Sequence, residues 1–250
     1  MSAPLWVGEA AREFWEAAGG PEPFPRDLRA PLARALPVAL VPLPRPRTQD
    51  VEGWLRRREV AFSFEAGDCP LRACLVAYNG RGIIFLDGAD PPAEQRFSLA
   101  HEIAHFLRHY WLPRQEVAAR LGPAAIAVLD GERAPTVEER IDALLARTWL
   151  GVHVHLLPRG AADLERVIAA EREADLLACE LLAPSDQVLA GIAPGPVPAR
   201  RQAVAARLRG EFGLPPGPAA RYAARLVPSE PQPGWLLERL GMGGSGRPPA

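Results

Sequence analysis

The segment QRFSLAHEIAHFLRHY, residues 95–110, places His101 and His105 four residues apart, with Glu102 next to the first histidine. An aspartate and two prolines precede the segment, a combination that favours the start of a helix. On a helix, residues four positions apart project within about 40° of each other. The two histidine rings are therefore expected to share one face, where they could bind one metal ion.

This helix has enough apolar residues to pack in a core without its histidines. Leu99, Ile103, Phe106 and Tyr110 fall on the opposite face, and the helix is expected to run from a cap at Asp90 to about Tyr110. The pattern H-E-x-x-H is typical of zinc hydrolases, but it arises by chance in on the order of one chain in a hundred. A metal site therefore requires a third ligand elsewhere in the chain.

A second strong helix, expected over residues 161–183, offers that ligand. Its apolar residues form a stripe about 140° wide, and Glu171 and Asp175 lie inside it. Carboxylates on a buried face are costly unless a metal, a cation or hydrogen bonds satisfy them. This phase favours Glu171 as a metal ligand and Asp175 as the partner of a ligand histidine, whereas Glu173 and Glu180 should point into solvent. A carboxylate paired with an arginine is the alternative.

The two segments together resemble the ImmA/IrrE family of metallopeptidases. RFSLAHEIAHFL, followed by EREADLLACELLAP, is similar to the family's HExxH helix and its later helix reading E-x-x-A-[ND] and closing on L-L-x-P. The resemblance covers residues 36–227. The site residues it implies are His101, His105 and Glu171 as metal ligands, Glu102 as general base, and Asp175 as the residue behind a ligand. The 65 residues between the second and third ligands (106–170) exceed the family's usual spacing, so we expect this insertion to alter substrate access.

Three protein ligands would leave a fourth zinc position open for water. Glu102, which is not a ligand, is expected to accept the proton of that water during attack on a peptide carbonyl. Zinc is the expected metal, with manganese or iron as alternatives. Four side chains remain candidates for stabilising the oxyanion, namely His109, Tyr110, His153 and His155.

The expected fold class is α+β and zincin-like, with a small antiparallel sheet packed against the HExxH helix and the second ligand-bearing helix. Tight turns favour Asn-Gly, so residues 71–78 and 82–87 should form a hairpin around Asn79 and Gly80. The other expected elements before the motif are a buried strand over 36–43, a helix over 48–58 and a strand over 59–64.

The chain is expected to contain one main domain with appendages. Its expected parts are a loosely attached leader (1–35), a zincin-like metallopeptidase domain (36–198) with a helical insertion (111–160), a helical hairpin resembling a helix–turn–helix (199–227), and a Pro/Gly-rich, disordered tail (228–250). We interpret 199–227 as a packed hairpin and not as a DNA reader, because the net charge is only -1.

Composition excludes several other classes. A net charge of -1 provides no footprint for nucleic acid, and the sequence contains neither a signal peptide nor an apolar run of membrane length. We therefore expect a cytoplasmic protein that binds neither nucleic acid nor membrane. Cys69, Cys74 and Cys179 have no pairing pattern and are assigned no function.

The resemblance also implies a substrate class. Members of the family typically cleave helix–turn–helix repressors and so induce stress, phage or mobile-element genes, which makes a zinc endopeptidase acting on such a repressor the first hypothesis. The alternative is a non-catalytic protein that keeps the zinc-site fold and regulates a repressor by contact. The intact Glu102 argues against that alternative.

Overall fold

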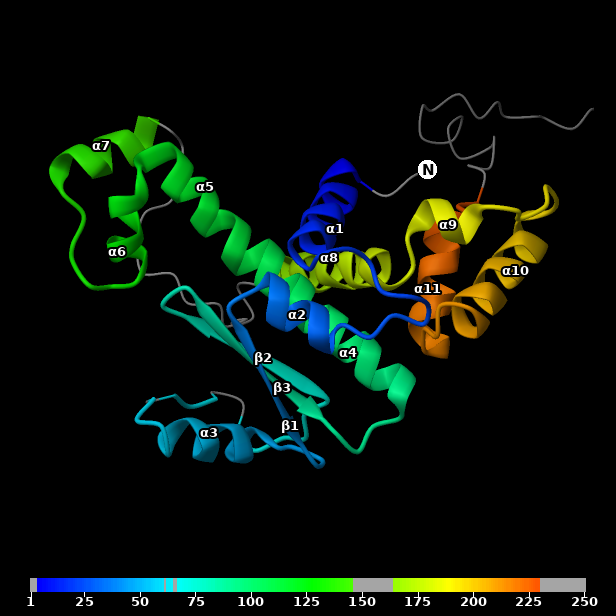
Figure 1. Cartoon of the computed structure of the whole chain (residues 1–250), viewed down its shortest axis with the longest axis horizontal. Helices are drawn as coiled ribbons and strands as arrows, with labels where there is room; N and C mark the ends of the chain where they lie inside the picture. The colour runs from blue at the N-terminus through cyan, green and yellow to red at the C-terminus, as the bar shows by residue number, and fades with distance from the viewer. Residues whose placement is uncertain (1–3, 61, 65–66, 146–163, 230–250) are drawn as a thin grey trace, which may run out of the picture.

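A computed structural model describes residues 4–60, 62–64, 67–145 and 164–229. In chain order, its elements are α1 (Leu5–Ala17), α2 (Arg29–Ala35), β1 (Val38–Leu43), α3 (Thr48–Arg56), β2 (Ala73–Tyr78), β3 (Arg81–Asp87), α4 (Pro92–His105), the π-helix η1 (Phe106–Trp111), α5 (Leu112–Leu121), the 3-10 helix η2 (Pro123–Ala125), α6 (Ile126–Leu129), α7 (Val137–Leu145), α8 (Leu164–Leu182), α9 (Ser185–Leu189), α10 (Val197–Gly210) and α11 (Pro216–Leu226). The expected α+β class is confirmed (Figure 1).

The sheet has three strands in the order β1-β3-β2. The predicted hairpin is confirmed: β2 and β3 pair antiparallel, and Asn79 and Gly80 both have positive φ, 47° and 70°. The expected small antiparallel sheet is in fact mixed, because β1 pairs parallel with β3, with Val38 opposite Gly82. Helix α3 lies between β1 and the hairpin in the chain, and a crossover of this kind lets two strands run in the same direction.

The two faces of the sheet pack against different helices, because successive side chains of a strand point to opposite sides. On one face, Val51 and Leu55 of α3 contact Val76 and Phe85. On the other face, Ile84 and its neighbours join the main core with α4. Figure 1 shows α3 and α4 on opposite sides of the sheet. The strand expected over 59–64 is absent from the described part of that segment, where Phe62 and Phe64 instead pack under α3.

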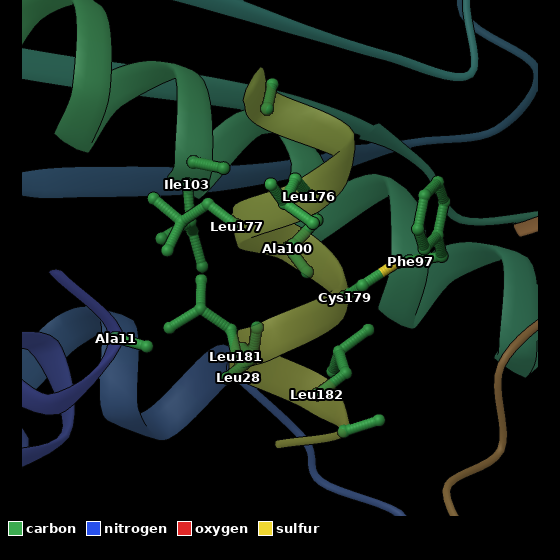
Figure 2. Packing of buried hydrophobic residues seen from close by; sticks show 14 of the residues in the cluster. Ala11, Leu28, Phe97, Ala100, Ile103, Leu176, Leu177, Cys179, Leu181 and Leu182 are labelled. Carbon is green, nitrogen blue, oxygen red and sulfur yellow. The ribbon is translucent and has the colours of Figure 1, made fainter. Parts of the chain in front are cut away.

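Helices α4 and α8 lie side by side at the centre of the main core (Figure 2). Ala100 and Ile103 of α4 face Leu177 and Leu181 of α8, and all four are fully buried. Burying a side chain the size of leucine or isoleucine stabilises a fold by about 1.5–3 kcal/mol. This packing fixes the two helices that carry the predicted metal ligands relative to each other.

The leader, expected to attach loosely, instead places α1 in the core beside α8. Val7, Phe14 and other residues at helical spacing form an apolar face of α1, which is buried. Arg26, itself buried, stacks on the rings of Trp15 and Phe24 and donates a hydrogen bond to the carbonyl of Leu181 at 2.7 Å. The N-terminal segment is thereby tied to the end of α8.

The HExxH helix differs from expectation at both ends. Pro91, not Asp90, occupies the cap position, because the first helical residue is Pro92. At the other end the helix does not stop near Tyr110 but continues through η1 into α5. Pro113 lacks an N–H and its ring crowds the preceding turn, so a π-helical turn before it is a physical solution that keeps the helix continuous.

The predicted insertion is helical where it is described. Helix α5 leads away from the sheet to α6 and α7 (Figure 1), and Val117, Ala125 and Leu129 form a small core there. A buried ion pair between Arg114 and Asp130, at 2.7 Å, joins α5 to the end of α6. The remainder of the predicted insertion, 146–160, lies outside the described residues.

The C-terminal hairpin of α10 and α11 is confirmed, and it packs against α8 and α9. It also corrects the prediction for Glu180, which is buried and not solvated. The Glu180 carboxylate accepts hydrogen bonds from the hydroxyl of Tyr222 at 2.7 Å and from the backbone of Ser185 at 3.1 Å. The tail expected over 228–250 lies outside the described residues beyond position 229.

Two further observations concern the cysteines and the length of the helices. None of the three cysteines, Cys69, Cys74 and Cys179, forms a disulfide. None of the helices in the described part of the chain combines the length and the apolar content needed to cross a membrane.

Candidate metal centre

Three side chains converge between α4 and α8. The Nε2 atoms of His101 and His105, one helical turn apart, are separated by 3.0 Å. One oxygen of Glu171 lies 3.2 Å from Nε2 of His101, and the other lies 3.5 Å from Nε2 of His105. Within the described ranges, these three residues form the group of side chains whose donor atoms are close enough to hold one metal ion. The structure therefore brings together the three residues that the sequence suggested as ligands.

The chemistry of this group fits a metal. Ligand atoms about 2.0–2.1 Å from a tetrahedral zinc lie about 3.3–3.4 Å from one another, close to the separations found here. Two imidazole nitrogens and a carboxylate oxygen form a donor set that zinc favours. His105 is buried, whereas the Glu171 side chain is 45% exposed, so the group is open on the side of α8.

Asp175 lies one turn beyond Glu171, where the sequence predicted it. Its Oδ1 lies 3.1 Å from Nδ1 of His101, and its Oδ2 accepts a hydrogen bond from Arg221 at 3.0 Å. A carboxylate facing Nδ1 favours the tautomer that carries its proton there. Once the ring is neutral, as metal binding requires, Nε2 of His101 carries the lone pair that a metal would bind.

The electrostatics of the group are those of a cation site. Burial disfavours the charged ring of His101, but the hydrogen bonds to Asp175 and Glu171 outweigh it and raise the pKa to about 10. Hydrogen bonds from His101 and then His105 hold the pKa of Glu171 far below its usual range. Without a metal, the carboxylate and a protonated histidine thus neutralise each other.

Glu102 lies beside the two histidines but is not part of the ligand group. Burial raises the pKa of its carboxyl, while the charges of His101 and His105 oppose that effect. The backbone of Leu75, in the edge strand β2, donates a hydrogen bond to the same carboxylate. Glu102 is therefore held where the edge of the sheet meets the metal-ligand helix.

The π-helix η1 contacts α8 on both sides of Glu171. Arg108 donates a hydrogen bond from Nε to Glu173 at 2.7 Å, and Nε2 of His109 lies 3.4 Å from the carbonyl oxygen of Ala170. The sequence pattern predicted neither of these contacts, and it placed Glu173 in solvent. They fix the rotation of α8 that turns Glu171 toward the histidines.

The four candidates for stabilising the oxyanion differ in where they lie relative to the metal ligands. The ring of His109 lies 5.3 Å from that of His105, and burial, then the charge of His105, lower its pKa to about 4. Tyr110 is fully buried, and its hydroxyl accepts a hydrogen bond from the backbone of Gly80 at 2.7 Å, so it faces the hairpin turn. His153 and His155 lie outside the described residues.

Residues 62–128 match the family model described as the IrrE N-terminal-like domain. The match contains β2, β3, α4 and α5, with both histidines and Glu102, and it ends before Glu171. No curated protein and no solved structure matches the chain. The resemblance drawn from the sequence motifs to the ImmA/IrrE family of metallopeptidases is thus supported by an independent comparison over residues 62–128, the region that carries the HExxH helix.

Proposed function

We propose that this protein is a zinc-dependent endopeptidase with a zincin-like arrangement of its sheet and two ligand helices. The ligands would be His101, His105 and Glu171. The observation that carries the proposal is the approach of both Glu171 oxygens to within 3.5 Å of the two histidines from a helix far along the chain. Manganese or iron are the alternatives to zinc with this donor set.

Each residue of the site has a role in peptide hydrolysis. Zinc, when bound, supplies a Lewis acid that polarises the scissile carbonyl and lowers the pKa of a bound water to about 7. Glu102 would take one proton from the attacking water and pass it to the amine that leaves when the C–N bond breaks. The raised pKa of Glu102 suits a group that both accepts and returns a proton near neutral pH. Asp175 would hold His101 in the tautomer and orientation that bind metal.

We infer that the substrate is a helix–turn–helix transcriptional repressor in a stress, phage or mobile-element response. The support is the family resemblance, since ImmA/IrrE proteins typically act on such repressors. A repressor substrate would also agree with a cytoplasmic location. The protein itself would not bind nucleic acid, because its net charge is -1.

A non-catalytic protein that regulates a repressor by contact is the second candidate. It would keep the metal ligands for stability, and it would have no need for a carboxylate at position 102. Glu102 is half-buried next to the two histidines and held by the backbone of Leu75, and this placement favours a catalytic function.

One experiment separates these functions. The zinc-loaded protein is incubated with the product of a neighbouring repressor gene and, separately, with casein, and Glu102→Gln is the control for each. One or two defined cuts in the repressor, absent with Glu102→Gln, are expected. Binding without cleavage would support the contact regulator, and digestion of casein at many sites would contradict a narrow substrate.

A further inference from the structure

We propose that Arg221, in the C-terminal hairpin, is a positioning residue of the metal centre. Helix α11 would then contribute to metal binding. The inference rests on the proposed metal site and adds to it a residue outside both ligand helices. Arg221 reaches the site through Asp175 and contacts no ligand itself.

A single carboxylate joins the arginine to the ligand. Nη2 of Arg221 donates to Oδ2 of Asp175 at 3.0 Å, and Oδ1 of the same group lies 3.1 Å from Nδ1 of His101. Each oxygen thus has its own partner. Because a free carboxylate rotates about its last torsion, a partner on Oδ2 restricts the direction in which Oδ1 faces the imidazole.

Helix α11 is built to hold the arginine at that place. Tyr222, the next residue, is buried and donates its hydroxyl hydrogen to Glu180 on α8 at 2.7 Å. Ala219, Ala223 and Leu226 of the same helix are also buried. In Figure 1, α11 lies beside the C-terminal part of α8. Two consecutive residues of α11 therefore bind two carboxylates of α8, about a turn and a half apart.

The competing explanation is an ordinary surface ion pair. The Arg221 side chain is 61% exposed, and exposed pairs contribute little to the stability of a fold. A surface pair would leave metal binding unchanged when it is removed. If Arg221 has a positioning role, its removal should weaken metal binding. The melting temperature of the metal-free protein should change little, since groups behind a ligand act mainly on metal affinity.

The test measures zinc affinity by competition with a chromophoric chelator, alongside the melting temperature of the metal-free protein. Arg221→Met should weaken zinc binding about 3–10-fold, less than the roughly 10–100-fold expected for Asp175→Asn, which faces the ligand directly. Arg221→Lys keeps the charge and should recover part of the loss. Arg225→Met, an exposed arginine one turn further along α11, is the matched control and should bind zinc like the wild type.

The double variant identifies the route of the effect. In an Asp175→Asn background, Arg221→Met should weaken zinc binding no further, because the contact it removes is already altered. The inference fails, and the metal site stands, if Arg221→Met binds zinc as tightly as the wild type. It also fails if Arg221→Met lowers the zinc affinity by the same factor in the wild-type and Asp175→Asn backgrounds. If the wild type binds no zinc, the proposed function fails and the inference with it. Should the methionine variant not fold, the lysine variant and its own Asp175→Asn double variant decide the same question.

Discussion

The imidazole Nε2 atoms of His101 and His105 face each other at 3.0 Å. Two such nitrogens can share at most one proton, so the pair tolerates this distance only with a cation or a proton between them. Glu171 approaches the pair from α8, and the packing of Ala100 and Ile103 against Leu177 and Leu181 holds α8 beside α4 (Figure 2). The core of the protein thus sets the geometry of the candidate site.

Replacing Glu102 by glutamine should abolish cleavage and leave zinc content and fold unchanged. Glutamine keeps the shape of the side chain and a carbonyl oxygen for the N–H of Leu75, but it cannot accept the proton. The check is turnover of the repressor together with metal analysis of the same sample. Loss of zinc along with activity would show that Glu102 is a ligand and not a base.

The two glutamates of α8 nearest the site should behave differently. Glu171→Ala should lose bound zinc, because only two ligands remain. Glu173→Ala should keep it and lower the free energy of unfolding by about 0–1 kcal/mol, since its ion pair with Arg108 is 37% exposed on each side. Zinc content and urea unfolding of both variants provide the check. Zinc loss in the Glu173 variant alone would mean that the assignment of α8 faces is wrong.

Zinc affinity should rise with pH well above neutrality. Metal must displace the proton of His101, whose pKa is raised to about 10, so the apparent affinity should increase about tenfold per pH unit between about pH 7 and 9. A histidine with its ordinary pKa would give a plateau above about pH 7. Chelator competition across this range measures the slope, and Asp175→Asn, which removes a hydrogen bond that raises the pKa, should level off at lower pH.

The same shift has an opposite consequence for the metal-free fold. A raised folded-state pKa at His101 stabilises the fold fully below about pH 6.5, and that contribution disappears as pH rises through about 10. The metal-free protein should therefore lose stability with rising pH over the range in which zinc binds more tightly. Urea unfolding of metal-free and zinc-loaded protein at several pH values would reveal the divergence.

Gly82→Ala should destabilise the protein by about 1–3 kcal/mol through overpacking. An added Cβ would lie 2.9 Å from ring atoms of Phe106 and 3.1 Å from Cγ2 of Val38, which leaves the start of η1 no room against β3. Gly8→Ala is the control, because a Cβ there meets nothing within 4 Å, and it should stabilise α1 by about 0.4–1 kcal/mol. Denaturant unfolding compares the two, and an unchanged midpoint for Gly82→Ala would contradict the packing described.

The sequence predicted what depends on local periodicity. The spacing of His101 and His105, and the choice of Glu171 over Glu173, follow from 3.6 residues per turn and needed no knowledge of the fold. The turn at Asn79 was equally local. The structure contains this turn and brings Glu171, not Glu173, to the two histidines, because each of these features is decided within a few residues.

What the sequence could not provide depends on contacts between distant residues. The pattern of its own helix predicts an exposed Glu180. The side chain is nevertheless buried, and Tyr222 of α11 donates a hydrogen bond to its carboxylate. Arg221 gives no local signal at all, since its partner is 46 residues away. The HExxH helix was expected to end near Tyr110, whereas η1 carries it on into α5.

The most direct test of the account is a crystal of the zinc-loaded protein measured on both sides of the zinc absorption edge. We expect one anomalous peak per chain, about 2.0–2.2 Å from Nε2 of His101, Nε2 of His105 and an oxygen of Glu171. No peak between α4 and α8, or a peak bound by other residues, would contradict the central claim.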